Sequence, residues 1–306
     1  QVTLSYYADA SNLRLDVENG NIDVAHRSLA PTDIAALSQN DAVTVHEGPG
    51  GEIRYMVFNF NTQPFGDAQP DADPVKAQAV RQAIAASIDR QEIATDIYQD
   101  TFTPLWSHIP DGLPGAGQQF KELYGDGNGM PDPEQATQRL ADAGVETPVS
   151  LAIQYSPDHY GPSSGDEYAR VKSQLEATGL FTVDLQSTEW VQYAQDRTQD
   201  VYPIHQLGWF PDYSDADNYL TPFFIRDNFL VNHYDNPEVQ ELIQQQLVEP
   251  DQAVREERFT QIQDLVAVDI PTLPLLQGKQ IAVAGADVEG VNLDPSFKFR
   301  FGSLSK

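Results

Sequence analysis

The sequence predicts an α/β fold, in which short strands and helices alternate along the chain. Between residues 149 and 207, β-rich runs are separated by stretches of helical length, the pattern of βαβ units with a largely parallel sheet. Apolar residues make up 40% of the 306 residues and are interrupted regularly by glycine and proline. This composition is typical of a folded globular chain with a sizeable core.

The first sixty residues are expected to alternate short strands with one helix. Val2–Tyr7 has the residue types of a strand, Gly20–Ala25 has those of a turn entering a strand, and 32–37 has those of a short helix. The run 54–60 is apolar enough to be a strand buried on both faces. Residues 62–74 hold three prolines and three aspartates, which indicates a linker or a crossing between domains.

Two helices in the middle of the chain carry clear start signals. Asp73 is placed to cap a helix whose first position is Pro74, and Asp132 precedes a second helix that Gly144 ends. Residues 103–133, between them, are expected to be irregular because they are rich in glycine and proline.

The second half is expected to continue with strands and helices and to close with two longer helices and short strands. The proline-rich run 269–275 is predicted to end the last helix. The expected strands are 149–155, 181–186 and 202–207, and the expected helices are 166–178, 190–196, 236–247 and 251–268.

The balance of charge excludes some partners. With 18 basic and 46 acidic side chains the formal charge is −28, which repels phosphate backbones, so we expect no binding to nucleic acid. The absence of cysteine excludes disulfides and thiolate sites. No stretch reaches the roughly 18 apolar residues that a membrane-spanning helix needs. Because the chain opens at Gln1 directly in a strand-like run, we expect a mature or truncated form.

No pattern in the sequence indicates catalysis. The nucleophile-elbow, phosphate-loop and dinucleotide-binding motifs are absent, and the six histidines are scattered without the spacing of metal ligands. Accidental carboxylate pairs are numerous among 46 acidic residues, so no pair is informative. We therefore expect no catalytic residue, no metal site and no cofactor.

The most distinctive run, 208–220, places aromatic side chains among three carboxylates directly after a predicted strand. Ligands of α/β proteins tend to bind at the carboxyl ends of strands. Aromatic faces beside a carboxylate suit a solute with an apolar body and an ammonium group. A packed turn with exposed acidic residues explains the same pattern equally well.

Several segments, in order, are similar to family 5 of the bacterial extracellular solute-binding proteins, which includes dipeptide-, oligopeptide- and nickel-binding proteins. The resemblance covers nearly the whole chain. It is carried by G-x-I-D at Gly20–Asp23, V-R-x-A-I…D-R at Val80–Arg90, P…S…P at Pro104–Pro110, D-P-x-x-A…L-x-x-A-G at Asp132–Gly144, G-W-x-x-D-Y at Gly208–Tyr213 and I-P-x-x-P-L at Ile270–Leu275.

The resemblance implies a class II periplasmic-binding-protein-like lobe, with a mixed or parallel sheet flanked by helices, plus part of a partner lobe. Residues 1–65 and 280–306 would be a remnant of the first, hinge-side lobe, and 66–279 would form the C-terminal substrate-binding lobe. An N-terminal portion with a signal peptide and a lipidated cysteine would be missing. Membrane association would depend on that absent anchor.

The same resemblance implies the function. The protein would be a monomeric, non-enzymatic receptor, extracellular or periplasmic at the cell surface, that captures peptides and delivers them to the membrane permease of an ABC importer. The resemblance places the solute ammonium on Asp212 and the pocket wall on Trp209, with Tyr213 and Asp215 as weaker candidates. Metal chelates and oligosaccharides remain open as other solutes, and a sensor or binding module outside transport remains open as another role.

Overall fold

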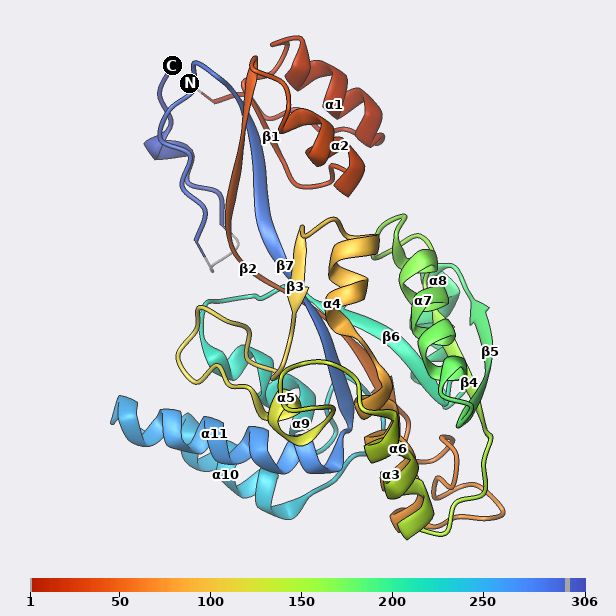
Figure 1. The fold of residues 1–306 in the computed structure, drawn as a ribbon. Coiled ribbons are helices and arrows are strands. Elements are labelled where there is room, and N and C mark those ends of the chain that lie inside the picture. The colour runs from red at the N-terminus through yellow and green to blue at the C-terminus, as the bar shows by residue number, and fades with distance from the viewer. Residues whose placement is uncertain (1, 295–297) are drawn as a thin grey trace.

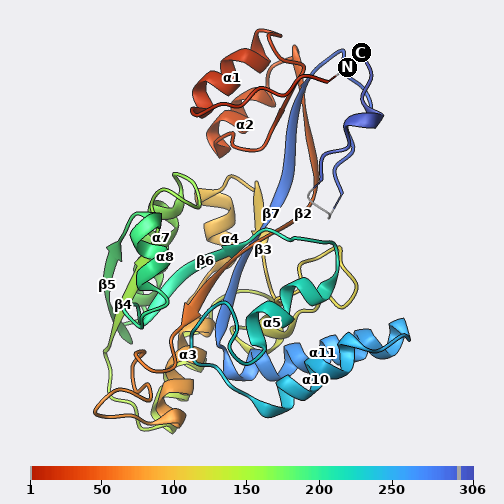
Figure 2. The ribbon, with the colours of Figure 1, turned by 180° about the vertical axis from the view of Figure 1, so that it is seen from behind.

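The computed structural model describes residues 2–294 and 298–306, which form a small lobe and a large lobe joined by two long strands (Figure 1). The ends of the described chain lie together at the small lobe in both views (Figure 1 and Figure 2). The strands are β1 (Val24–His26), β2 (Val43–Phe58), β3 (Phe102–Pro104), β4 (Val149–Tyr155), β5 (Phe181–Ser187), β6 (Ile204–Trp209) and β7 (Thr272–Gly285).

Helices cover both lobes, and short single turns fill the connections. The helices are α1 (Ala10–Glu18), α2 (Pro31–Leu37), α3 (Pro74–Ser87), α4 (Arg90–Glu92), α5 (Gln119–Leu123), α6 (Pro133–Asp142), α7 (Ser164–Ala177), α8 (Trp190–Asp196), α9 (Thr221–Phe224), α10 (Pro237–Leu247) and α11 (Gln252–Asp269). The single turns are η1 (Ile93–Ile97), η2 (Ala216–Tyr219) and η3 (Phe301–Ser303).

One mixed sheet of seven strands runs through both lobes in the order β1-β7-β2-β6-β4-β5, with β3 pairing to β7. The βαβ prediction holds for β4, β5 and β6, which pair in parallel. The remaining described pairings between strands are antiparallel, namely β1 with β7, β2 with β6, β2 with β7 and β3 with β7. The expected α/β class with a mixed sheet is therefore confirmed, although the sheet is less parallel than its strand–helix rhythm suggests.

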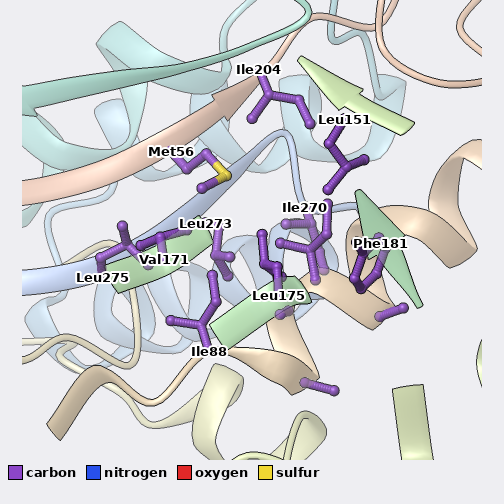
Figure 3. Close-up of a cluster of buried hydrophobic side chains, with 14 of the residues drawn as sticks. Met56, Ile88, Leu151, Val171, Leu175, Phe181, Ile204, Ile270, Leu273 and Leu275 are labelled. Carbon is purple, nitrogen blue, oxygen red and sulfur yellow. The ribbon is translucent and has the colours of Figure 1, made fainter. Parts of the chain in front are cut away.

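The apolar pattern of β2 explains how one strand serves two cores. Met56 and Phe58 point into a core with α3, α7 and β4, whereas Ile53, Tyr55 and Val57 point into a second core with β6, α10 and α11. Alternate side chains of a strand face opposite sides of the sheet, so both faces of β2 are buried here. Figure 3 shows the first core, where Met56 and Leu273 meet Leu151, Val171, Leu175 and Ile204.

The predicted caps are confirmed. The carboxylate of Asp73 accepts hydrogen bonds from the backbone N–H of Val75 at 3.0 Å and of Lys76 at 3.2 Å, at the start of α3. Asp132 does the same at the start of α6, and Gly144 follows that helix with φ +66°. A side-chain acceptor at the N-cap and a glycine after the last turn satisfy backbone groups that a helix end leaves open.

Two local predictions are wrong, and one helix was not predicted. Residues 2–7 form no strand, and the nine-residue helix α1 that follows was not expected. The closing strands are not short, since β7 is a 14-residue strand that includes Pro274. Pro274 fits because it lies at an irregularity in the pairing with β2, opposite Tyr55.

The turn-rich segment 62–74 does not connect the lobes. It lies at the end of the large lobe that is remote from the small lobe (Figure 1). The described chain crosses between the lobes within β2 and β7, where Gly48 pairs with Gln280 and Glu52 pairs with Gly278. The assignment of 1–65 and 280–306 to one lobe and 66–279 to the other stays a prediction.

Candidate functional site

A cleft of about 680 Å³ lies between the two lobes, beside the crossing of β2 and β7. Segments distant in sequence meet there because the two long strands connect the lobes. The lining comes from 7–10 and 26–31 with Leu13 and Ile34 on the small lobe, from Tyr98, Thr101, Phe102, 158–163 and Phe210 on the large lobe, and from Glu52, Arg54 and 279–281 on the crossing strands.

Two charged residues of β2 lie at the floor of this cleft. Glu52 and Arg54 occupy alternate positions on the face that carries Met56 further along, so the charges begin where the apolar core ends. Arg54 is only 5% exposed. Its Nε donates to Oε1 of Glu52 at 2.6 Å, and its Nη2 pairs with the same oxygen.

Aromatic rings enclose the Arg54 guanidinium, which lies 4.7 Å from the ring centre of Tyr160 and 5.6 Å from that of Phe102. Cation–π attraction stabilises such a stack. Gly208, opposite Arg54 on β6, makes room for it, since a Cβ there would lie 2.9 Å from Cε1 of Tyr160. The glycine of the Gly208-Trp209 pair thus has a packing role beside the cleft.

The electrostatics of the floor keep Arg54 charged. Burial is the largest single influence and opposes the charge on the guanidinium, but Glu52, Tyr98, Glu167 and Tyr160 together outweigh it, so the pKa of Arg54 lies above its usual value. Behind the pair, the Tyr98 hydroxyl donates to Oε2 of Glu167 at 2.6 Å. Burial raises the pKa of the Glu167 carboxyl, which favours its neutral form.

One wall of the cleft is built on the loop after β4. The imidazole of His159 stacks on the indole of Trp190, with ring centres 3.6 Å apart and planes within 5°. The carboxylate of Asp158 fixes this loop by accepting from the hydroxyl of Ser156 and the backbone N–H of Trp190, both at 2.9 Å. Burial lowers the pKa of His159, which favours the neutral imidazole.

The last residue of β6, Trp209, and the loop after it hold the four residues predicted to bind solute. Asn218 accepts hydrogen bonds from two of them. The indole N–H of Trp209 donates to Oδ1 of Asn218 at 2.9 Å, and the backbone N–H of Asp212 donates to the same oxygen at 3.0 Å. The Trp209 ring also packs against Phe223 and Phe229. Trp209 is therefore held rigidly at the end of β6.

The acidic residues of this loop differ in their surroundings. Asp215 accepts two hydrogen bonds of 2.8 Å from Arg255, and Tyr213 donates to buried Asp217 at 3.2 Å. The carboxylate of Asp212 is exposed and has no partner within residues 2–294 and 298–306. Burial opposes ionisation of Asp215, but hydrogen bonds from Arg255 and from the Asp217 backbone outweigh it, so the pKa of Asp215 is lowered.

The four predicted residues lie together in one loop but are not among the residues that line the cleft. Their neighbour Phe210 does line it. A role for Trp209, Asp212, Tyr213 and Asp215 in binding thus stays a prediction.

Sequence reasoning missed Glu52, Arg54 and His159. The available signal was a Glu-x-Arg pair directly before the apolar run of β2, where charge is costly to bury without a purpose.

Comparison with known proteins decides the family. The model of "Bacterial extracellular solute-binding proteins, family 5 Middle" matches residues 1–230. This chain belongs to family 5 of the bacterial extracellular solute-binding proteins. Members of family 5 are extracellular or periplasmic solute-binding proteins of transport systems, and they are not enzymes.

Relatives in the family differ in the solute that their names state. The dipeptide-binding protein of Escherichia coli is 22% identical over 281 residues, which are 90% of this chain and 49% of that protein. Heme-binding protein A of Haemophilus influenzae is 24% identical over 310 residues, which are 96% of this chain and 52% of that protein. The chain therefore spans about half the length of the curated relatives that it matches.

A solved structure supports the fold. The dipeptide-binding protein from Pseudoalteromonas sp. SM9913, in complex with Met-Leu, aligns with a TM-score of 0.77 at 23% identity, over 98% of this chain and 57% of that one. The expected periplasmic-binding-protein-like architecture is confirmed. Within the described ranges, no helix is both long enough and apolar enough to cross a membrane.

Asp215 is paired with Arg255 and Asp212 is unpaired within the described residues, so mutation of each tests the contribution of the ion pair to stability. Asp215→Asn, which keeps a capping side chain, is expected to lower the free energy of unfolding at pH 7 by up to about 1 kcal/mol, since this ion pair is partly exposed. A lowered folded pKa stabilises the protein above the unfolded pKa of about 3.9, and this contribution is lost as the pH falls through the folded value. In urea titrations the difference in the free energy of unfolding between wild type and variant should therefore narrow as the pH falls below about 3.9.

Asp212→Asn is the matched control, because it removes the same charge from the same loop without breaking an ion pair. It should stay within about 0.5 kcal/mol of wild type at every pH. If the difference in the free energy of unfolding between wild type and Asp215→Asn widens as the pH falls, the lowered pKa of Asp215 is contradicted.

Proposed function

We propose that this protein is the solute-capturing receptor of an ABC importer, and that it binds peptides in the cleft between its lobes and delivers them to the membrane permease. The observation that carries the proposal is the cleft itself, in a chain that belongs to family 5, with polar and aromatic walls contributed by both lobes. Capture would take place outside the cytoplasmic membrane, at the cell surface or in the periplasm, with the receptor acting as a monomer.

The connection between the lobes suits capture by closure. Within the described residues the lobes are linked by the β2 and β7 segments near Gly48–Glu52 and 278–280. Domain closure about a few hinge residues is a common way to enclose a ligand. We propose that solute contacts from both lobes stabilise the closed form, with the large lobe as the main binding lobe and the small lobe as the hinge-side lobe.

A peptide fits the chemistry near the end of β6. Asp212 offers an exposed carboxylate, and its backbone N–H shares the acceptor Oδ1 of Asn218 with the indole of Trp209. The carboxylate and the indole can take an ammonium group and its apolar neighbourhood. Asp215 suits this role less well because Arg255 already neutralises it. We therefore keep Trp209 and Asp212 as the proposed ammonium subsite, with Tyr213 beside it.

Thermal unfolding of the full-length protein with a solute panel tests the proposal. Di- to hexapeptides at about 100 times their Kd should raise the stability by roughly 2.7 kcal/mol, which corresponds to a rise in Tm of a few degrees. The panel also contains heme, nickel–histidine chelates and oligosaccharides. A rise in Tm with one of these solutes and with no peptide would contradict the proposal that the solute is a peptide, but not the proposal that the protein is a solute receptor. The absence of a shift with every solute would contradict both.

The role of Asp212 has a separate test. Asp212→Asn should weaken binding of peptides with a free N-terminus by roughly 10- to 100-fold, because a charge-assisted hydrogen bond is lost, and should leave N-acetylated peptides unaffected. Titration calorimetry measures both. The control is Asp71→Asn, an exposed aspartate in the turn-rich segment 62–74. Equal losses for free and acetylated peptides would argue against an ammonium contact.

A further inference from the structure

Aromatic side chains line the cleft from both lobes. They are Tyr7 on the small lobe and Tyr98, Phe102, Tyr160 and Phe210 on the large lobe, together with the imidazole of His159. Some of these rings already have partners within the protein. Tyr98 packs against Phe102 with ring centres 4.4 Å apart, and Tyr160 covers the guanidinium of Arg54. His159 differs from them, because its stacking partner lies on the side away from the cleft.

His159 is the exposed end of a column of three stacked rings. Its imidazole stacks on the indole of Trp190 with ring centres 3.6 Å apart, and the indole is followed by the ring of Tyr193 at 5.8 Å and a tilt of 25°. Tyr193 is fully buried, and its hydroxyl donates to the backbone carbonyl oxygen of Gln206 at 2.6 Å. The column is therefore anchored in the core of the large lobe and ends at the cleft.

The face of the imidazole that points away from Trp190 is open among the described residues. His159 lines the cleft and is exposed, whereas Trp190 does not line it. The ring of Tyr160 lies 4.7 Å from the imidazole and 5.6 Å from the indole. A ring on the far face of the imidazole would lie much further from the indole, so Tyr160 stands beside the stack and leaves that face uncovered.

The loop holds this ring in place before a solute arrives. Asp158 fixes the loop through Ser156 and Trp190, and the backbone N–H of Ser156 donates to Oε1 of buried Gln206 at 3.1 Å. Recognition by groups that are already ordered costs less conformational entropy.

The charge state of His159 favours an uncharged partner. Burial, and after it the nearby Arg54 guanidinium, lower the pKa of His159, so the imidazole is neutral at pH 7. A cation from the solute would be repelled by Arg54 at this position. A neutral planar ring has no such cost.

The small lobe contributes apolar side chains to the same cleft, namely Leu13, Leu29, Pro31 and Ile34. Closure of the lobes, as proposed above, brings these side chains towards the large lobe. An aromatic ring held between them and the imidazole gains both burial and stacking.

We propose that His159, supported by Trp190, is a stacking platform for an aromatic side chain of the solute, so that the receptor prefers peptides that carry an aromatic residue. This inference rests on the proposed receptor function and names the side chain that this wall of the cleft recognises. The preference comes from the ring faces, because aromatic pairs gain free energy beyond that of the buried area.

Six tripeptides test the platform: Phe-Ala-Ala, Ala-Phe-Ala and Ala-Ala-Phe, and the same three with cyclohexylalanine in place of phenylalanine. The cyclohexyl ring is of similar size and at least as hydrophobic, but it has no aromatic face. Titration calorimetry on the full-length protein is expected to show, for at least one position, an affinity for the phenylalanine peptide that is roughly 3- to 10-fold higher than for its cyclohexylalanine counterpart.

His159→Leu should remove this preference, because leucine keeps an apolar side chain but has no planar face. His159→Phe should keep it, since a benzene ring can stack between Trp190 and the solute. The matched control is Phe301→Leu, which removes the ring of a half-exposed residue of η3 that does not line the cleft. It should keep the wild-type ratio of affinities.

Two results overturn the proposal: wild-type protein that favours phenylalanine by no more than about twofold at every position, or folded His159→Leu protein that keeps the wild-type preference. A histidine with a purely structural role would give the second result together with a lower Tm. Wild-type protein that binds none of the six tripeptides also overturns this proposal, whereas the receptor proposal falls only if the wider solute panel fails as well.

Discussion

The antiparallel pairing of β2 with β7 is the constraint on which the rest of the structure depends. It extends from Val43 opposite Gly285 in the small lobe to Val57 opposite Thr272 in the large lobe. A Cβ on Gly50 would lie 1.7 Å from the carbonyl oxygen of Gly278, so the two strands approach at the crossing only because glycine stands there. Cores form on both faces of this pair, and each lobe is positioned by it.

The same pair explains why charged residues are buried beside the cleft. Further along β2 its side chains are apolar on both faces, and the polar pair Glu52 and Arg54 begins where the sheet leaves the core. Breaking a buried ion pair costs about 3–5 kcal/mol, whereas replacing both partners with apolar groups is often neutral or stabilising. Stability alone therefore gives little reason for the pair.

The sequence predicted what local chemistry controls. Asp73 and Asp132 are recognisable as N-caps because their side chains accept hydrogen bonds from backbone N–H groups of the first turn. The predicted bounds of helix α8, Trp190–Asp196, agree with the structure at both ends. The length of β2 was not predictable, because the Gly-Pro-Gly-Gly run 48–51 reads as a turn unless the partner strand is known. Pro274 argued against a strand for the same reason, since its tolerated position depends on the pairing with β2.

The candidate site was predicted only in part, because its contacts are long-range. The loop 208–215 was recognisable from its aromatic and acidic residues, but the neutralisation of Asp215 depends on Arg255, 40 residues away. Arg54 and Tyr160 meet only through the sheet, across Gly208, and nothing local to either residue reports that contact. The local sequence pattern therefore identified the end of β6, whereas the cleft could be identified only from the tertiary structure.

Hydrogen–deuterium exchange of the full-length protein with and without a bound solute tests the central claim most directly. If the cleft between the lobes is the binding site, solute should slow exchange simultaneously in 26–31 of the small lobe and in 158–163 of the large lobe, both of which line it. Slowed exchange in only one of these segments, or in neither while the solute is bound, would contradict the account.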